Sequence, residues 1–361
     1  MIALPYPLMQ LVEHLSHHGI RSIFVGGFVR DHFSGHTTHD LDIELYGVTS
    51  LESLETLLKP FGKVGLYGKS FGVIKLTYEG YSIDFSPPRT ESKSGFGHKG
   101  FETTWFSDMG FTAAARRRDF TINAIGYDPL TQTFLDPYGG IADLKARTLR
   151  CVDPETFVDD PLRILRAVQF AARFELSCDN TLLALCREMI AEGAFTELPK
   201  ERIFEEFKKL FLLSAHPSIG LKLLEKMGGR HLFEPLSDEA WNRAQERIDT
   251  IAEHRYKTDI LALGQMFAAV LIECTDPVKV LEHLTDQRNV IKTTIQIINY
   301  AKHSGDFILP PEPLVQGRDL IALGLTPSEE FKSILEKAYS AQLNQVFFTH
   351  EEALAWLVTQ L

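Results

Sequence analysis

The chain contains few cysteines. Its 361 residues include only four, and no two of them form a C-x-x-C pair: Cys151, Cys178, Cys186 and Cys274. A zinc ribbon or a disulfide framework needs cysteines at close and regular spacing. The sequence therefore argues against both and is typical of a protein that folds in a reducing compartment.

Long hydrophobic runs are also missing. No apolar run in the sequence approaches the roughly 20 residues that a helix needs to cross a bilayer. The N-terminal residues do not show a basic segment followed by an apolar stretch, which is the pattern of a secretory signal. We therefore expect a protein with no membrane partner that is located in the cytoplasm.

Positive charge is scarce, since 37 Lys and Arg stand against 48 Asp and Glu, a formal net charge of −11. Proteins that adhere broadly to nucleic acid normally carry an excess of basic residues. Here the basic residues gather locally, as at 116–118, 145–147 and 208–209. This distribution favours recognition of one end of a nucleic acid by its shape.

The stretch 20–46 contains an apolar run, a Gly-Gly pair, a short helix-like segment and a second apolar run that begins at Asp40. Side chains alternate between the two faces of a strand, so Asp40 and Asp42 point the same way. Two carboxylates held side by side repel each other, and a hard divalent cation such as Mg²⁺ takes oxygen ligands of this kind. The stretch therefore predicts a metal-binding pair.

Gly26-Gly27 lies at the start of the helix-like segment, where backbone N–H groups can approach a phosphate closely. Alone, an Asp-x-Asp is usually a solvated strand edge, and a Gly-Gly pair is usually a turn. The combination Gly-Gly-x-Val-Arg-Asp followed by Asp-x-Asp resembles the signature of the DNA polymerase beta-like nucleotidyltransferases. It has the form seen in bacterial tRNA nucleotidyltransferases (CCA-adding enzymes) and poly(A) polymerases. The resemblance implies that Asp40 and Asp42 bind two Mg²⁺ ions and that Gly26, Gly27 and Arg30 hold a nucleoside triphosphate.

The residues from 73 to 86 alternate like two strands joined at Glu79-Gly80, which is a hairpin signal. Asp84 lies in the second strand, five residues before Arg89. Members of the family place a carboxylate at this distance before an Arg. The resemblance therefore nominates Asp84 as a third catalytic carboxylate.

A long connection rich in Gly, Ser, Thr and Lys is expected from 90 to 116. Connections of this length are usually functional or disordered, and the composition by itself indicates only mobility. The sequence of the segment resembles the flexible loop of bacterial CCA-adding enzymes. In those enzymes the loop helps the site change from CTP to ATP.

A second motif, Arg-Arg-Asp-Phe-Thr-Ile-Asn-Ala, spans residues 117–124. Alone, its first three residues could form a surface ion-pair cluster. Helical spacing would place Asp119 and Asn123 on one face, where they form a polar patch that can hold a ribose. The motif matches the family signature without a substitution, which implies that Arg118, Asp119 and Asn123 contribute to nucleotide recognition.

A third motif begins at Asp159-Asp160-Pro161 and continues into an amphipathic helix that includes Arg166. Pro at the first helical turn and acidic residues at the N-terminus are typical of a capped helix, in which Asp160 and Arg163 would form a surface pair. The motif also resembles the family's Glu-Asp-x-x-Arg, with Asp159 where Glu is usual. The resemblance implies that Asp160 and Arg163 read the Watson–Crick edge of the incoming base and that Arg166 belongs to the nucleotide-binding set.

Two further segments bear on the helical half of the chain. The pattern Glu-Arg-x-x-x-Glu at 201–206 occurs in the family, and we interpret it as an ion-pair network within one helix that braces the neck. Many relatives carry a phosphohydrolase domain marked by a His-Asp pair, but the comparable segment 257–271 has none. We expect a degenerate region without hydrolase activity. The segment 317–343 resembles the helical body that holds tRNA in these enzymes.

These patterns predict an α+β protein in which a small mixed β-sheet head is followed by an all-helical neck, body and tail. The expected boundaries are 1–145 for the nucleotidyltransferase head, 146–214 for the neck and 215–361 for the body and tail. The resemblance implies Mg²⁺-dependent addition of C and A residues to the 3′ end of tRNA from CTP and ATP.

Several alternatives stay open at this point. The chain could be a poly(A) polymerase or a partial enzyme that adds only CC or only A, although the long 90–116 segment argues against CC-only addition. A catalytically inactive RNA-binding protein is a more remote alternative, because the Asp40, Asp42 and Arg-Arg-Asp set is intact. The sequence is compatible with a monomer or a dimer.

Overall fold

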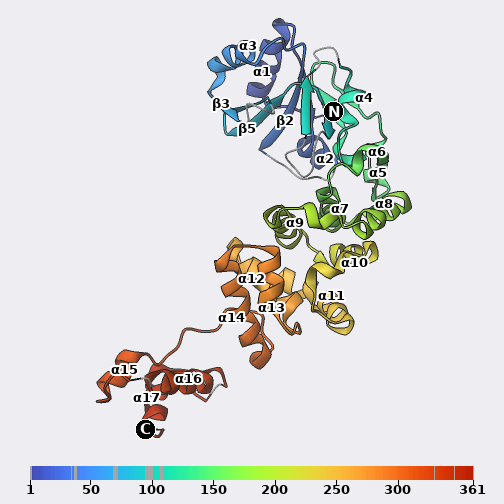
Figure 1. The fold of residues 1–361 in the computed structure, drawn as a ribbon. Coiled ribbons are helices and arrows are strands. Elements are labelled where there is room, and N and C mark those ends of the chain that lie inside the picture. The colour runs from blue at the N-terminus through green and yellow to red at the C-terminus, as the bar shows by residue number, and fades with distance from the viewer. Residues whose placement is uncertain are drawn as a thin grey trace. The chain divides into compact units, whose positions relative to one another are not determined.

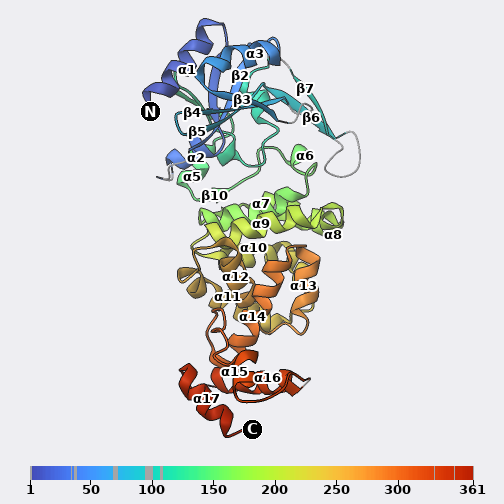
Figure 2. The same cartoon turned by 90° about the vertical axis from the view of Figure 1, so that its left-hand side faces the viewer.

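The computed structural model describes residues 2–33, 35, 39–67, 72–93, 101–105, 109–328, 330–344 and 346–360. These residues fold as two compact units. The first comprises Met1–Ile203 with Leu223–Gly229, and the second comprises Phe204–Lys222 with Arg230–Leu361. The strands belong to the first unit, and the described residues of the second unit form helices and their connections (Figure 1; Figure 2). The predicted α+β class is therefore confirmed, whereas the boundaries at 145 and 214 stay a prediction.

A seven-stranded mixed sheet forms the centre of the first unit. Its strand order is β3-β4-β5-β2-β1-β8-β9, and β2 runs parallel to β5 whereas the other neighbours are antiparallel. The strands are β1 (Arg21–Val25), β2 (Asp40–Tyr46), β3 (Lys63–Tyr67), β4 (Val73–Tyr78), β5 (Tyr81–Ser86), β8 (Gly126–Asp128) and β9 (Thr133–Leu135). α1 (Tyr6–His17) precedes β1, α2 (Gly27–Phe33) connects β1 to β2, and α3 (Leu51–Leu58) follows β2.

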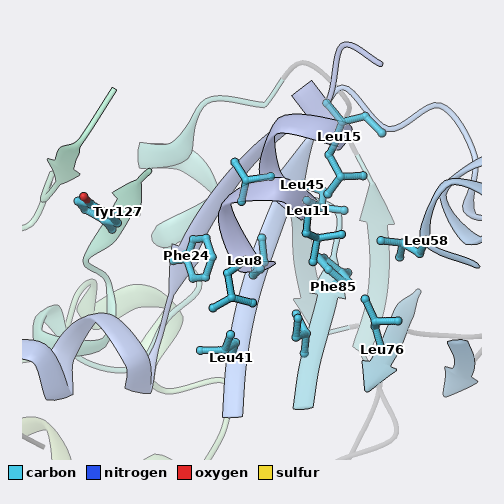
Figure 3. Packing of buried hydrophobic residues seen from close by; sticks show 14 of the residues in the cluster. Leu8, Leu11, Leu15, Phe24, Leu41, Leu45, Leu58, Leu76, Phe85 and Tyr127 are labelled. Carbon is cyan, nitrogen blue, oxygen red and sulfur yellow. The ribbon is translucent and has the colours of Figure 1, made fainter. Parts of the chain in front are cut away.

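The hydrophobic core of this sheet explains the orientation of β2. Leu41 and Leu45 of β2 are buried together with Leu8 and Leu11 of α1 (Figure 3). Because side chains alternate along a strand, burial of these leucines turns Asp40 and its even-numbered neighbours to the opposite face. The sequence pattern of β2 thus places its acidic side chains away from the apolar core.

The predicted hairpin at Glu79-Gly80 is confirmed. Both turn residues have positive φ, 49° and 80°, as a two-residue turn between antiparallel strands requires. The turn fixes the register in which Lys75 of β4 lies opposite Asp84 of β5. On its other side β5 pairs with β2, and Asp84 lies beside Asp42.

The expectation of one long connection over 90–116 is wrong where the structure describes this segment. β6 (Arg89–Lys93) and β7 (Phe101–Trp105) pair antiparallel as a separate two-stranded sheet, and α4 (Phe111–Ala115) follows. The strands are rich in Thr and aromatic residues, which favour extended structure. Residues 94–100 and 106–108, on which part of the flexible-loop expectation depends, lie outside the described residues.

Residues 119–123, which were predicted to be helical, do not form an α-helix. Phe120 is extended and bridges to Cys151, and only Thr121–Asn123 form a short 3₁₀ helix, η2. The remaining elements of the unit are α5 (Gly140–Lys145), β10 (Thr148–Leu149), α6 (Pro154–Phe157), α7 (Leu162–Arg173), β11 (Ser177–Cys178), α8 (Asn180–Ala191) and η3 (Ala194–Glu197). The neck was predicted to be all-helical, but β10 and β11 pair as a short parallel sheet within it.

The second unit is built from helices around buried aromatic side chains. Phe207 packs edge-to-face on Phe233, and Phe211 does the same on Phe267, with ring centroids 5.1 and 5.0 Å apart. α9 (Lys200–Leu213) and α10 (Pro217–Met227) contribute residues to both units. η4 (Gly229–Phe233), α11 (Asp238–Glu253), α12 (Asp259–Leu271), α13 (Pro277–Leu284), α14 (Arg288–Ser304), α15 (Gly317–Ala322), α16 (Glu330–Leu343) and α17 (His350–Val358) follow. No helix among the described residues is long and apolar enough to span a bilayer.

Candidate active site

Residues from all three sequence motifs line one pocket of about 400 Å³ in the first unit. The lining combines a glycine turn, one carboxylate of β2, the segment 117–123 and the start of α7. It consists of Gly26, Gly27, Arg30, Asp42, Arg117, Arg118, Asp119, Asn123, Asp160, Arg163 and Arg166. Asp40, on the same strand as Asp42, and Asp84, on the adjacent strand β5, are not among the lining residues. The structure thus brings together residues that are up to 140 positions apart in the sequence.

Gly26 forms the turn between β1 and α2 and lies against Asp42. Its φ is +68°, and a Cβ atom at this position would lie 2.9 Å from Oδ2 of Asp42. Only glycine adopts this conformation without cost and leaves room for the carboxylate. Glycine at this position therefore allows the turn to lie close to β2.

Three carboxylates lie near one another on the adjacent strands β2 and β5. Asp42 is paired in register with Asp84, and Asp40 lies two residues earlier on the same strand. Desolvation raises the pKa of Asp42; the nearby charges of Asp84 and Asp40 act in the same direction, and Arg118 opposes them. The three groups therefore repel one another, which favours a cation between them.

The hydrogen bonding of Asp84 also favours a cation at this place. Its Oδ2 accepts a hydrogen bond of 2.8 Å from Lys75 Nζ, whereas its buried Oδ1 has no hydrogen-bond partner among the described residues. A divalent ion would satisfy such an oxygen. No group of three or more His, Cys, Asp or Glu side chains in the described part of the chain is arranged to hold a metal by itself. The carboxylates fit a cation such as Mg²⁺ that completes its ligands with phosphate oxygens and water.

Glu44 is a site residue that the sequence analysis missed. It is fully buried, and its Oε1 accepts hydrogen bonds of 2.8 Å from Nη2 of both Arg117 and Arg118. Tyr46 donates its hydroxyl to the other oxygen at 3.0 Å. Burial opposes ionisation of Glu44, but the two arginines outweigh it and hold the pKa below its ordinary value. Glu44 continues the alternating acidic pattern of Asp40 and Asp42, which is the signal that could have revealed it.

Arg30, predicted to hold the triphosphate, is almost completely buried. Its guanidinium donates to Asp31 Oδ1 at 2.8 Å and to Asn123 Oδ1 at 2.7 Å. The same group lies 4.5 Å from the ring centroid of Phe174 and 5.2 Å from that of Phe170. These contacts join α2 to α7, so Arg30 braces the pocket, and its contact with phosphate stays a prediction.

Asp119 and Asn123 form the predicted polar patch, although the backbone between them is not an α-helix. Asn123 Nδ2 donates to Asp119 Oδ1 at 2.9 Å, and Arg166 Nε donates to Asp119 Oδ2 at 2.7 Å. Burial raises the pKa of Asp119, but Arg166 and these hydrogen bonds outweigh it, so the pKa lies below its ordinary value. The patch is therefore a charged and fixed part of the pocket wall.

Asp160 and Arg163 line the pocket, but the structure pairs each of them with other groups. Asp160 Oδ1 accepts from the backbone N–H of Leu162, and its Oδ2 lies 3.2 Å from Nη2 of Arg202. Arg163 donates at 2.7 Å to the backbone carbonyls of Thr156 and Arg117. These contacts fix the start of α7. Arg202 thus pairs outside its own helix, which differs from the expected ion-pair network within the 201–206 helix, where Glu206 pairs with Lys209. Base reading by Asp160 and Arg163 stays a prediction.

Known proteins resemble the chain in both sequence and fold. Residues 22–150 match a family model described as the poly A polymerase head domain, and residues 179–239 match one described as a probable RNA and SrmB-binding site of polymerase A. A "Multifunctional CCA protein" of Azoarcus sp. is 39% identical over 229 residues, which cover 63% of this chain and 52% of that protein. The Xylella fastidiosa (strain M12) protein of the same name is 33% identical over 276 residues, covering 73% of this chain and 63% of that protein.

The fold extends the likeness to nearly the whole chain. A solved structure of the Thermotoga maritima CCA-adding enzyme complexed with tRNA_CCA aligns with a TM-score of 0.68 and 22% identity, covering 99% of this chain and 96% of that one. The chain spans only about half to two-thirds of the length of the curated relatives it matches. From the head-domain match, these relatives and the shared architecture together, the chain belongs to the family of CCA-adding enzymes and poly(A) polymerases.

Proposed function

We propose that the chain is a metal-dependent nucleotidyltransferase that adds the C and A residues of CCA to the 3′ end of tRNA from CTP and ATP, with release of pyrophosphate. The observation that carries the proposal is the single pocket in which Asp42, the Arg-Arg-Asp segment and the start of α7 meet. The relatives named as CCA proteins and the related structure in complex with tRNA support the same reaction.

Asp40 and Asp42 would hold Mg²⁺, and Asp84 would assist them. When bound, the metal lowers the pKa of the attacking 3′-hydroxyl and neutralises charge on the leaving pyrophosphate. The contribution of the chain is to hold the carboxylates close together, Asp40 and Asp42 on β2 and Asp84 on the adjacent strand β5. Their mutual repulsion in the protein is the reason why a cation binds there more favourably than water.

The remaining lining residues would position the nucleotide. The backbone at Gly26 and Gly27 would approach the phosphates, and Arg118 would stabilise their charge. Asp119 and Asn123 would accept and donate hydrogen bonds to the ribose. Because these groups are already fixed by one another, little conformational freedom is lost when the nucleotide binds.

Asp160 and Arg163 would read the base. Cytosine and adenine each present an amino donor beside a ring-nitrogen acceptor, whereas uracil and guanine present a carbonyl and an N–H at those positions. A carboxylate acceptor beside a guanidinium donor matches the first two bases and mismatches the others. A bidentate pair of this kind contributes about 1–3 kcal/mol of discrimination.

The test is to give the purified protein three tRNA substrates, ending before CCA, after C and after CC, with CTP and ATP separately and together. The proposal predicts two C additions followed by one A, and each step needs the correct nucleotide. Incorporation of A alone on the CC substrate would identify an A-adding enzyme, and a long A tail would identify a poly(A) polymerase. Absence of incorporation on all three substrates would overturn the proposal.

We also place the protein in the cytoplasm. All four cysteines are free. Burial raises the pKa of Cys151 to about 11 and that of Cys178 to about 12, so both stay protonated thiols at neutral pH. Buried thiols of this kind are stable in a reducing compartment, where tRNA is also available. Fractionation of cells that express the tagged protein would test the location.

A further inference from the structure

A second pocket, lined by residues of the second unit, has an unusual concentration of positive charge. It has a volume of about 310 Å³ and lies between the C-terminal half of α9 and the residues that lead into α12. Its charged lining consists of four cations and two carboxylates, in a chain whose net charge is −11: Lys208, Lys209, Arg255, Lys257, Glu205 and Asp259. We call it the α9–α12 pocket.

Arg255 is the half-buried cation of this pocket. Its Nη1 donates to the backbone carbonyl of Phe211, and within the described part of the chain no carboxylate pairs with it. Burial lowers the pKa of Arg255 without an opposing acidic neighbour. Removing a guanidinium from water without a counter-charge is unfavourable, and an anion in the pocket would offset that cost.

The other cations differ in how they are held. Lys208 Nζ lies 3.2 Å from Asp259 Oδ2, and Lys209 Nζ lies 2.7 Å from Glu206 Oε1. Lys257 is exposed at the rim and forms no ion pair with any residue that the structure describes. Arg255 and Lys257 therefore supply positive charge that the protein itself leaves uncompensated.

Tyr256 separates these two cations and is fixed at both ends. Its backbone N–H donates to Gln265 Oε1 at 3.2 Å, and its hydroxyl accepts from the backbone N–H of Leu309 at 2.9 Å. The tyrosine also lines the pocket. Fixed aromatic side chains among basic residues are typical of surfaces that contact a nucleic-acid strand.

The family model described as a probable RNA and SrmB-binding site covers residues 179–239. It includes the α9 wall of the pocket but not the wall formed by 255–262. The description names both RNA and SrmB as partners. The chemistry of the α9–α12 pocket favours RNA, because its uncompensated charges and small volume fit one phosphate group with its sugar better than a protein surface.

We propose that the α9–α12 pocket binds a phosphodiester of the RNA substrate, with Arg255 and Lys257 as the direct phosphate ligands. The inference rests on the proposed function in one respect, that the substrate is an RNA. Lys208 and Lys209 shape the site through their ion pairs and raise its potential. The contact positions the RNA and carries no sequence information, as is usual for phosphate contacts.

The experiment measures binding of unmodified tRNA to the full chain at several salt concentrations, for the wild type and the Lys257→Glu variant. The matched control is Lys292→Glu, which makes the same charge change at an exposed position of α14. We expect Lys257→Glu to weaken tRNA binding roughly fivefold or more and to reduce the slope of log affinity against log salt by about 1. The control should change the affinity for tRNA by less than twofold and leave the salt slope unchanged.

A second variant and a kinetic readout separate the possible outcomes. Arg255→Gln should weaken tRNA binding similarly, provided that its thermal melt matches the wild type; if it unfolds, Lys257→Glu alone decides. In both variants KM for tRNA should rise while KM for CTP stays unchanged. Equal salt slopes and equal tRNA affinities for wild type, Lys257→Glu and Lys292→Glu would overturn the inference. Failure of the proposed function is distinct, since the wild type would then incorporate no nucleotide at all.

Discussion

The two pockets differ in how some of their cations are paired with carboxylates. In the first unit Arg118 is paired with buried Glu44, and Arg166 is paired with Asp119. In the α9–α12 pocket Arg255 and Lys257 have no such partner among the described residues. A buried side chain in an ion pair has a fixed orientation, and salt screens its charge little. An exposed cation without a partner is screened by salt and is available to bind an anion. The difference suits the first pocket to selecting a small ligand and the second to holding a polyanion.

The largest expected effect is that of Asp42→Ala, which removes the carboxylate nearest the glycine turn. Nucleotide incorporation should fall at least about a hundredfold, because loss of a metal ligand removes several kcal/mol of transition-state stabilisation. Asp306→Ala, at an exposed position of the second unit, is the control and should leave activity unchanged. Affinity for tRNA should stay the same in both variants, since the second pocket is intact. Near-wild-type turnover of Asp42→Ala would remove this residue from the mechanism.

Glu44→Gln tests how far the first pocket depends on fixed charge. Removing one partner of a buried ion pair takes this counter-charge away from Arg117 and Arg118, and we expect about 3–5 kcal/mol of lost stability at neutral pH. Tyr46→Phe, which removes one hydrogen bond to the same carboxylate, should cost only about 1 kcal/mol. Both values come from denaturant unfolding curves. If Glu44→Gln costs no more than Tyr46→Phe, the arginines are not held by this charge.

The pH dependence of the same variant has a definite sign. The pKa of Glu44 is below its ordinary value of 4.5 in the folded protein. Its contribution to stability is therefore present above that ordinary value and is lost as the pH falls through the lowered pKa. The stability difference between wild type and Glu44→Gln should narrow on acidification. A difference that stays constant down to the acid limit of the native state would contradict the assigned charge state.

Gly26→Ala separates backbone strain from the contact with Asp42. Both Gly26 and Gly35 have positive φ, +68° and +71°, but only at Gly26 would a Cβ meet a carboxylate oxygen. Each substitution should cost about 1–2 kcal/mol of stability through its backbone conformation. Gly26→Ala should in addition lower incorporation, because the new methyl displaces Asp42. Equal activity in the two variants at matched melting temperatures would show that the close approach is not needed for catalysis.

The sequence could predict those parts of the site that depend on residues close together along the chain. Alternation along β2 predicted that Asp40 and Asp42 share a face, and the Glu79-Gly80 turn predicted the hairpin that carries Asp84. The pairing of Asp84 with Asp42 across two strands, however, depends on the order of strands in the sheet. Only the family resemblance suggested it beforehand.

Other features depended on contacts between distant residues and were missed or misassigned. Glu44 meets Arg117 across 73 positions, and no local pattern indicates which side chains compensate a buried acid. Asp119 and Asn123 were expected on a helix, but Phe120 is drawn into an extended bridge with Cys151 by the packing of the following segment. The α9–α12 pocket likewise unites residues about fifty positions apart, so its charge was invisible in the sequence.

Arg163→Ala tests most directly whether the pocket of the first unit selects the base. The measurement is single-nucleotide incorporation with CTP, ATP, UTP and GTP, made beside a thermal melt. If Arg163 reads the base, relative misincorporation of UTP and GTP should rise roughly tenfold, which corresponds to about 1.4 kcal/mol for one lost bidentate contact. If its bonds to the carbonyls of Thr156 and Arg117 are its whole role, the melting temperature and all four rates should fall together. Unchanged incorporation ratios with a lowered melting temperature would contradict the claim.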